Sequence, residues 1–156
     1  MNSGRFMPWV SLTMRLSIGS LFIIAGLAKI ADPVGFFATL MGFRLFPDLV
    51  LPLLAICLPW LEFLLGLCLL LGIAHRTASL LLAGLNVFFA AAILSLVARG
   101  IEIDCGCFGL LADILHIPDA ADMTAVMRDL VFAGMCIPVF RSGQTVFSLE
   151  SYFKAR

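Results

Sequence analysis

Long apolar runs separated by short polar stretches dominate the pattern of this chain. They extend over about residues 8–30, 51–73, 77–98 and 123–140. Each is close to the roughly 20 residues that an α-helix needs to cross the hydrocarbon core of a bilayer. Continuous runs of this length favour helices over the strands of a membrane β-barrel, in which apolar and polar residues alternate over about ten residues. The pattern predicts four transmembrane helices.

The first apolar run could also be the hydrophobic region of a signal peptide, because its uninterrupted core from Leu16 to Ala28 is short. However, Lys29, Asp32 and Pro33 make a poor cleavage context, and three further runs follow. We therefore predict that this segment is retained as the first of the four helices.

The composition agrees with this pattern. Hydrophobic residues make up 62% of the chain and charged residues only 13%, which is far from the composition of soluble domains. The 156 residues leave no room for a second, soluble domain beside four spans. We expect one transmembrane domain over residues 1–156, an all-α bundle in contact with lipid. The formal net charge of zero gives no basic surface for nucleic acid.

The links between the runs predict how the bundle is oriented. Short links, such as the His75-Arg76 turn, make neighbouring helices antiparallel. With the N-terminus inside, the cytoplasmic side receives more Lys and Arg than the outer side. The cytoplasmic set is Arg5, Arg15, Arg76, Arg141, Lys154 and Arg156, and the outer set is Lys29, Arg44, Arg99 and Arg128. This bias predicts cytoplasmic N- and C-termini and a periplasmic link at residues 99–122.

One face of the first helix combines polar and small residues. At 100° per residue this stripe consists of Arg15, Gly19, Phe22, Gly26 and Lys29. It should face protein, because a charge in lipid is costly and glycines permit close helix packing. Glu62 on the second helix is the best available partner for Arg15. A structural ion pair is favoured over a proton or ligand site.

The remaining polar residues inside the spans have simpler explanations. Cys57, Cys68 and Cys136 are expected to pack as small hydrophobic residues. Ser79 and Asn86 share a face of the third helix, where hydrogen bonds between helices explain them.

Two cysteines one residue apart lie in the longest polar link, in the run Cys105-Gly106-Cys107-Phe108-Gly109. Such a pair can form a disulfide or bind a soft metal, and the glycine lets the backbone bend. With only His116 as a further ligand, the four-ligand set of structural zinc is missing, so we predict no metal site. The ring closed by a Cys105–Cys107 disulfide is very small, and strain favours exchange over a purely structural bond. A structural disulfide that pins the loop stays the alternative.

Other residues are expected to support this loop. Gly106, Phe108 and Gly109 belong to the run itself. Arg128 and Asp129, near the start of the fourth helix, would form an interfacial pair or complete a polar pocket under the loop.

The cysteine run, placed between the third and fourth apolar segments, resembles the signature of the methylamine-utilisation protein E (MauE) family. The first helix, from Arg15 to Gly19 and on to Gly26 and Lys29, resembles the wider DoxX-like group. The resemblance extends over nearly the whole chain. It implies a four-helix protein of the bacterial inner membrane.

For function, the resemblance implies a part in the maturation of methylamine dehydrogenase, whose small subunit is rich in disulfides, or in related periplasmic thiol chemistry. It makes Cys105 and Cys107 the redox pair. It also implies that Arg15, Lys29 and Glu62 form the polar core of the scaffold.

Two functions of different classes follow. In the first, the chain is a thiol-disulfide oxidoreductase: the Cys105–Cys107 disulfide accepts electrons from a periplasmic thioredoxin-like protein or a substrate protein and passes them to a membrane carrier, for which quinone is the candidate. In the second, the chain is a non-enzymatic membrane assembly factor or chaperone, and the disulfide only shapes a docking loop. Solute transport is less favoured, because four spans carry few intramembrane charges.

Overall fold

The structure, a computed structural model, describes residues 3–101, 103–104, 106 and 120–142, with side chains from Trp9 onward. In this part of the chain the helices are α1 (Ser3–Ala31), α2 (Pro33–Phe43), α3 (Leu51–Leu71), α4 (His75–Arg99) and α6 (Met123–Arg141). Four of them, α1 from Trp9 onward, α3, α4 and α6, are long and apolar enough to cross a membrane. The predicted all-α integral membrane protein with four spans is confirmed, so the chain is a multi-pass membrane protein.

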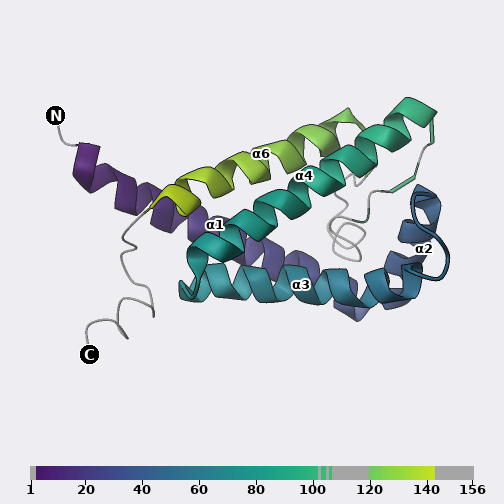
Figure 1. The fold of residues 1–156 in the computed structure, drawn as a ribbon, viewed down its shortest axis with the longest axis horizontal. Coiled ribbons are helices and arrows are strands. Elements are labelled where there is room, and N and C mark those ends of the chain that lie inside the picture. Colours follow the sequence, from purple (N-terminus) through teal and green to yellow (C-terminus); the bar gives the residue numbers. More distant parts are fainter. Residues whose placement is uncertain (1–2, 102, 105, 107–119, 143–156) are drawn as a thin grey trace.

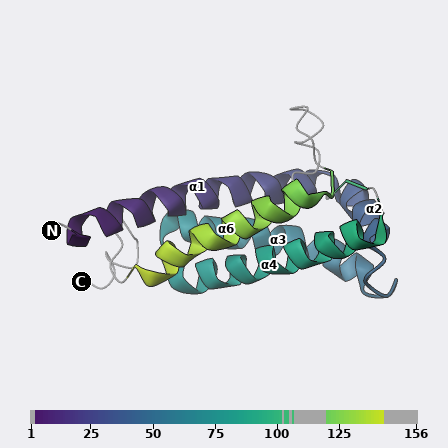
Figure 2. The same cartoon turned by 90° about the horizontal axis from the view of Figure 1, so that it is seen from above.

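The four long helices form an antiparallel bundle (Figures 1 and 2). The most extensive contacts are between α1 and α3 and between α4 and α6. The start of α1 and the end of α6 lie at one end of the bundle, whereas α2 lies at the other end (Figure 1). The candidate site lies inside the bundle, between its middle and this second end.

A short helix, α2, occupies the connection between the first two spans, which the apolar pattern did not separate as an element. Asp32 caps it by accepting a hydrogen bond from the Gly35 backbone N–H at 3.0 Å, and Pro33 suits the first turn. The helix ends at Arg44, whose backbone is left-handed. One face packs on the start of α3, in a buried cluster of Phe36, Leu40, Leu51 and Ala55. This packing holds α2 across the end of the bundle.

The segment after α4 is tied to this end by backbone contacts. Nη2 of Arg99 donates to the Phe43 carbonyl at 2.7 Å, which joins the end of α4 to the end of α2. Farther on, the Ala121 N–H donates to the Ile103 carbonyl at 2.8 Å. The chain therefore returns to α6 close to where it left α4.

Asp122 caps the start of α6, just before the fourth span. Its Oδ1 accepts from the Thr124 hydroxyl at 2.6 Å and from the Ala125 N–H at 3.0 Å. The Thr124 hydroxyl and then the Ala125 N–H stabilise the ionised form, so the pKa of the Asp122 carboxyl lies below its ordinary value.

Candidate functional site

Lys29 and Glu62 form a buried ion pair between α1 and α3. The two helices lie very close here, because a Cβ on Gly26 would be only 2.9 Å from the backbone N of Phe63. Nζ of Lys29 is 2.6 Å from Oε2 of Glu62, and the two side chains are 4% and 2% exposed. Such a short charge-assisted hydrogen bond is strong, and either charge would be costly at this depth without the other.

Two aromatic rings from other helices also lie near the Lys29 ammonium. Its Nζ is 5.5 Å from the ring centroid of Phe36 on α2 and 5.7 Å from that of Phe89 on α4. Both distances are within the range of cation–π attraction, about 6 Å. Helices α1, α2, α3 and α4 thus all contribute to the surroundings of this one cation.

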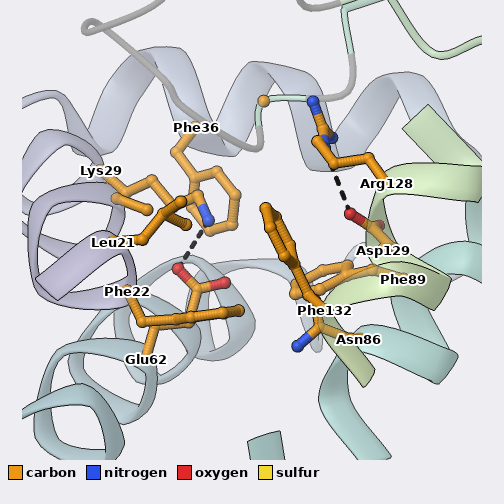
Figure 3. A pocket seen from close by; sticks show the side chains of 12 residues that line it. Leu21, Phe22, Lys29, Phe36, Glu62, Asn86, Phe89, Arg128, Asp129 and Phe132 are labelled. Carbon is orange, nitrogen blue, oxygen red and sulfur yellow. Dashed lines mark hydrogen bonds and ion pairs between the residues drawn. The ribbon is translucent and has the colours of Figure 1, made fainter. Parts of the chain in front are cut away.

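A second charged pair lies across the pocket, on α6 (Figure 3). Nε of Arg128 is 3.4 Å from Oδ1 of Asp129, and the two side chains are 22% and 6% exposed. The other carboxylate oxygen, Oδ2 of Asp129, is buried and accepts no hydrogen bond in the described part of the chain. A buried acceptor of this kind is a natural place for a donor from a ligand or a water molecule.

Both pairs line one pocket of about 450 Å³, a volume that includes the space at its open side. The lining is mostly aromatic and aliphatic, with the charged groups at two edges. It consists of Leu21, Phe22, Ala25, Lys29, Phe36, Glu62, Asn86, Phe89, Gly106, Arg128, Asp129 and Phe132. Leu21 on α1, Phe89 on α4, and Arg128 and Phe132 on α6 keep partial exposure, so the lining is not fully enclosed by the described residues.

Gly106 brings the segment after α4 into this lining. It is buried, and its φ of 64° is left-handed, a conformation that favours glycine. A Cβ at this position would lie 2.8 Å from Cγ2 of Thr39 on α2, which is too close for a real contact. Both the backbone angle and the close approach to α2 therefore require glycine between the two cysteines.

The sequence matches a known protein family over most of its length. A profile of the family described as methylamine utilisation protein MauE matches residues 7–141. The chain belongs to the MauE family. This confirms the resemblance seen in the cysteine run, and it places the protein in a family involved in methylamine utilisation.

Three MauE relatives illustrate the similarity. The methylamine utilization protein MauE of Paracoccus denitrificans is 30% identical over 135 residues, which cover 85% of this chain and 69% of that protein. The MauE protein of Methylorubrum extorquens is 37% identical over 102 residues, covering 65% and 55%, and that of Methylophilus methylotrophus is 29% identical over 133 residues, covering 85% and 68%. This chain thus aligns with about half to two thirds of the relatives' length. No solved structure matches it.

The predicted site residues of this MauE family member divide into three groups. Those in the pocket lining are Lys29, Glu62, Gly106, Arg128 and Asp129. Those outside the described residues are Cys105, Cys107, Phe108 and Gly109. The third group is Arg15 alone, which is buried on the predicted stripe but does not line the pocket.

The expected pairing of Arg15 with Glu62 is wrong, because Glu62 pairs with Lys29 instead. Arg15 precedes Lys29 by fourteen residues, which is about 21 Å along a helix axis. One carboxylate cannot serve both positions. The stripe itself is confirmed, since Arg15 and Lys29 are both buried against protein.

Sequence reasoning missed the aromatic part of the pocket. Phe36, Phe89 and Phe132 look like any lipid-facing phenylalanine in an apolar run. The available signal for Phe36 was the Asp32-Pro33 pair, which is typical of a helix start. Asn86 was expected to bond between helices, whereas its Nδ2 donates to Leu82 O on its own helix at 2.8 Å, and the residue lines the pocket.

The three cysteines within the spans differ from one another in burial. Cys136 is buried and Cys68 is half-buried, as expected for packed residues, but Cys57 is exposed on α3. The prediction of core packing is therefore wrong for Cys57. None of the three lines the pocket.

Proposed function

We propose that this MauE family member is a thiol-disulfide oxidoreductase of the bacterial inner membrane that serves methylamine utilisation. Cys105 and Cys107 are its redox pair, displayed on the periplasmic side. Its partner is a periplasmic thioredoxin-like protein or a disulfide-rich substrate protein, of which the small subunit of methylamine dehydrogenase is the candidate.

The position of Gly106 carries this proposal. Gly106 lies in the lining of the pocket that holds the Lys29–Glu62 and Arg128–Asp129 pairs. Cys105 and Cys107 are its direct neighbours in the sequence, and consecutive Cα atoms are about 3.8 Å apart. A loop used only to dock a partner would not need the residue between its two cysteines to be buried in the lining of this pocket.

The proposed exchange proceeds in two thiol-transfer steps. A thiolate of the partner attacks one sulfur of the Cys105–Cys107 disulfide, which gives a mixed disulfide and one free thiolate on the chain. The partner's second thiolate then attacks the partner sulfur of the mixed disulfide. The partner leaves as a disulfide and the chain as a dithiol, so two electrons and two protons have moved to Cys105 and Cys107.

Two observations support the proposed topology, with cytoplasmic termini and a periplasmic site. The start of α1 and the end of α6 lie at one end of the bundle and α2 lies at the other (Figure 1). The pocket is lined by the later half of α1, by α2 and by the first half of α6, so it lies toward the α2 end. The Lys and Arg bias of the sequence assigns the N- and C-terminal ends of the spans to the cytoplasm. The pocket end then faces the compartment in which disulfides persist.

Trapping a mixed disulfide tests the exchange. In intact cells, Cys107→Ser or Cys105→Ser should leave one thiol that attacks the disulfide of an oxidised partner and stays bonded to it, because no second thiol can release the partner. The adduct should disappear on reduction. Cys57→Ser, which removes an exposed cysteine away from the pocket, is the matched control and should trap nothing. If neither loop variant traps a partner, the exchange proposal fails.

A double variant separates exchange from an assembly role. Cys105→Ala/Cys107→Ala should abolish methylamine-dependent growth while the protein stays at its normal level in the membrane. Growth at the wild-type rate would instead assign the chain an assembly role in which the disulfide has no chemical part.

A further inference from the structure

We infer that the pocket binds the ring of a membrane quinone, which re-oxidises the Cys105–Cys107 pair. This inference rests on the proposed exchange function and names the acceptor of its electrons. It is drawn from three features of the pocket: its aromatic walls, its paired charges and its open side.

The walls of the pocket suit a flat ring. Phe36 on α2, Phe89 on α4 and Phe132 on α6 approach it from three directions (Figure 3). Phe132 also contacts Phe22 edge to face, with 6.2 Å between the ring centroids, so a second ring holds Phe132 in place. Aromatic side chains of this kind stack on planar ligands.

The two charged pairs suit the two oxygens of a quinone. A quinone carries carbonyl oxygens on opposite sides of its ring, and Lys29 and Arg128 supply cationic N–H donors from opposite sides of the pocket (Figure 3). After reduction these oxygens become hydroxyl donors. Each cation has a carboxylate beside it, Glu62 and Asp129, and Oδ2 of Asp129 is buried without a donor in the described residues. Each end of the pocket can therefore serve both redox states.

The open side suits a ligand that arrives from the lipid. The partly exposed Leu21 and Phe132 lie on α1 and α6, which are spans that face the bilayer. A ring can thus enter from the membrane while its apolar tail stays in the lipid.

The proposed reaction balances without a further reactant. The Cys105 and Cys107 thiols lose two protons and two electrons, and a sulfur–sulfur bond forms between them. The quinone gains both electrons and both protons, and its two carbonyl groups become the two hydroxyl groups of the hydroquinone.

Photolabelling tests the site on the full chain in lipid nanodiscs. A short-tailed azido-ubiquinone should label peptides that contain Phe36, Phe89 or Phe132, and unlabelled decylubiquinone should compete. Phe132→Ala should raise the half-competing concentration of decylubiquinone about three- to tenfold, the size of one aromatic contact. Phe140→Ala is the matched control, because Phe140 is an exposed phenylalanine on the same helix outside the pocket, and it should leave competition unchanged.

Further variants keep the outcomes distinct. Phe132→Leu removes the ring face but keeps most of the apolar volume. If Phe132→Ala fails to fold, Phe132→Leu takes its place and should likewise weaken competition. Cys105→Ala/Cys107→Ala should be labelled like the wild type, because the site does not require the thiols. Label spread over lipid-facing residues, or equal competition in the Phe132 and Phe140 variants, overturns the quinone site even if mixed disulfides are trapped. Pocket labelling without any trapped partner would instead overturn the exchange.

Discussion

The two helix pairs of the bundle are packed in different ways. Between α1 and α3 the backbones touch: a Cβ on Gly66 would lie 2.9 Å from the Gly19 carbonyl oxygen and 3.0 Å from the Ile23 N. Between α4 and α6 the space is filled by side chains, in a cluster that includes Ala90, Ile93, Leu96, Ala125 and Val126. The glycines of this second pair, Gly84 and Gly134, have nothing within 4 Å of a built Cβ.

This difference explains where the pocket can form. The close α1–α3 pair fixes Lys29 against Glu62 within 2.6 Å, whereas α4 and α6 contribute larger side chains such as Phe89 and Phe132. The pocket lies where the two pairs meet. The Lys29–Glu62 pair forms a charged wall on the α1–α3 side. It faces Phe89 and Phe132, beside which the Arg128–Asp129 pair lies, and this arrangement is the basis of the proposed chemistry.

Breaking the charged wall should give the largest effect. Glu62→Leu leaves the Lys29 ammonium buried without its anion and should lower the free energy of unfolding by about 3–5 kcal/mol. Lys29→Met should cost a similar amount. The measurement is equilibrium unfolding by SDS in mixed micelles.

The double variant is the control for this prediction. Lys29→Met/Glu62→Leu should recover most of the loss, because an apolar pair of similar volume replaces both charges. If the double variant lost as much free energy of unfolding as the two single variants together, Lys29 and Glu62 would not stabilise each other.

Filling a glycine contact should separate the two helix pairs next. Gly66→Ala forces the α1 and α3 backbones apart and should cost about 1–3 kcal/mol, as overpacking does elsewhere. Gly84→Ala adds the same methyl group on α4 in open space and should be neutral or slightly stabilising. The same SDS titration compares them, and equal losses would contradict the packing difference.

The link between α4 and α6 offers a finer comparison. Gly106→Ala and Gly100→Ala both force a non-glycine residue to a φ near 65°, but only Gly106 has a close neighbour, Thr39. Gly106→Ala should therefore destabilise by about 1 kcal/mol more than Gly100→Ala. Thr39→Ala should remove that excess in the double variant. An unchanged excess would show that Thr39 is not the obstacle.

The smallest effect should come from the cap of α6. The pKa of Asp122 is lower in the folded protein than in the unfolded chain, so its contribution is complete above the unfolded pKa and is lost as pH falls through the folded pKa. Asp122→Ala should remove this dependence of stability on pH below about pH 4. At pH 7 it should reduce stability only slightly. Thermal unfolding of the wild type and of Asp122→Ala at a series of pH values would measure this dependence. Parallel profiles for the two proteins would exclude the Asp122 cap as its source.

The sequence predicted the spans better than the site, for a physical reason. Length and apolarity define a membrane helix, and they could be read directly from the chain. The partner of Glu62 depends on the axial register between two helices, which no local pattern records, and so the sequence does not distinguish Lys29 from Arg15 as that partner. The role of Phe36 depends on α2 folding back over the bundle. The sequence signal for that helix was the Asp32-Pro33 pair at its start.

The central claim is that Cys105 and Cys107 act together as one two-electron redox pair. The direct measurement is the redox state of the purified chain in a series of thiol–disulfide buffers, read by mass spectrometry of alkylated peptides. We expect both cysteines to be oxidised in a single transition to one intramolecular disulfide, while Cys57, Cys68 and Cys136 stay reduced. A chain in which Cys105 and Cys107 stay reduced at every potential, or pair only with other molecules, would contradict the account.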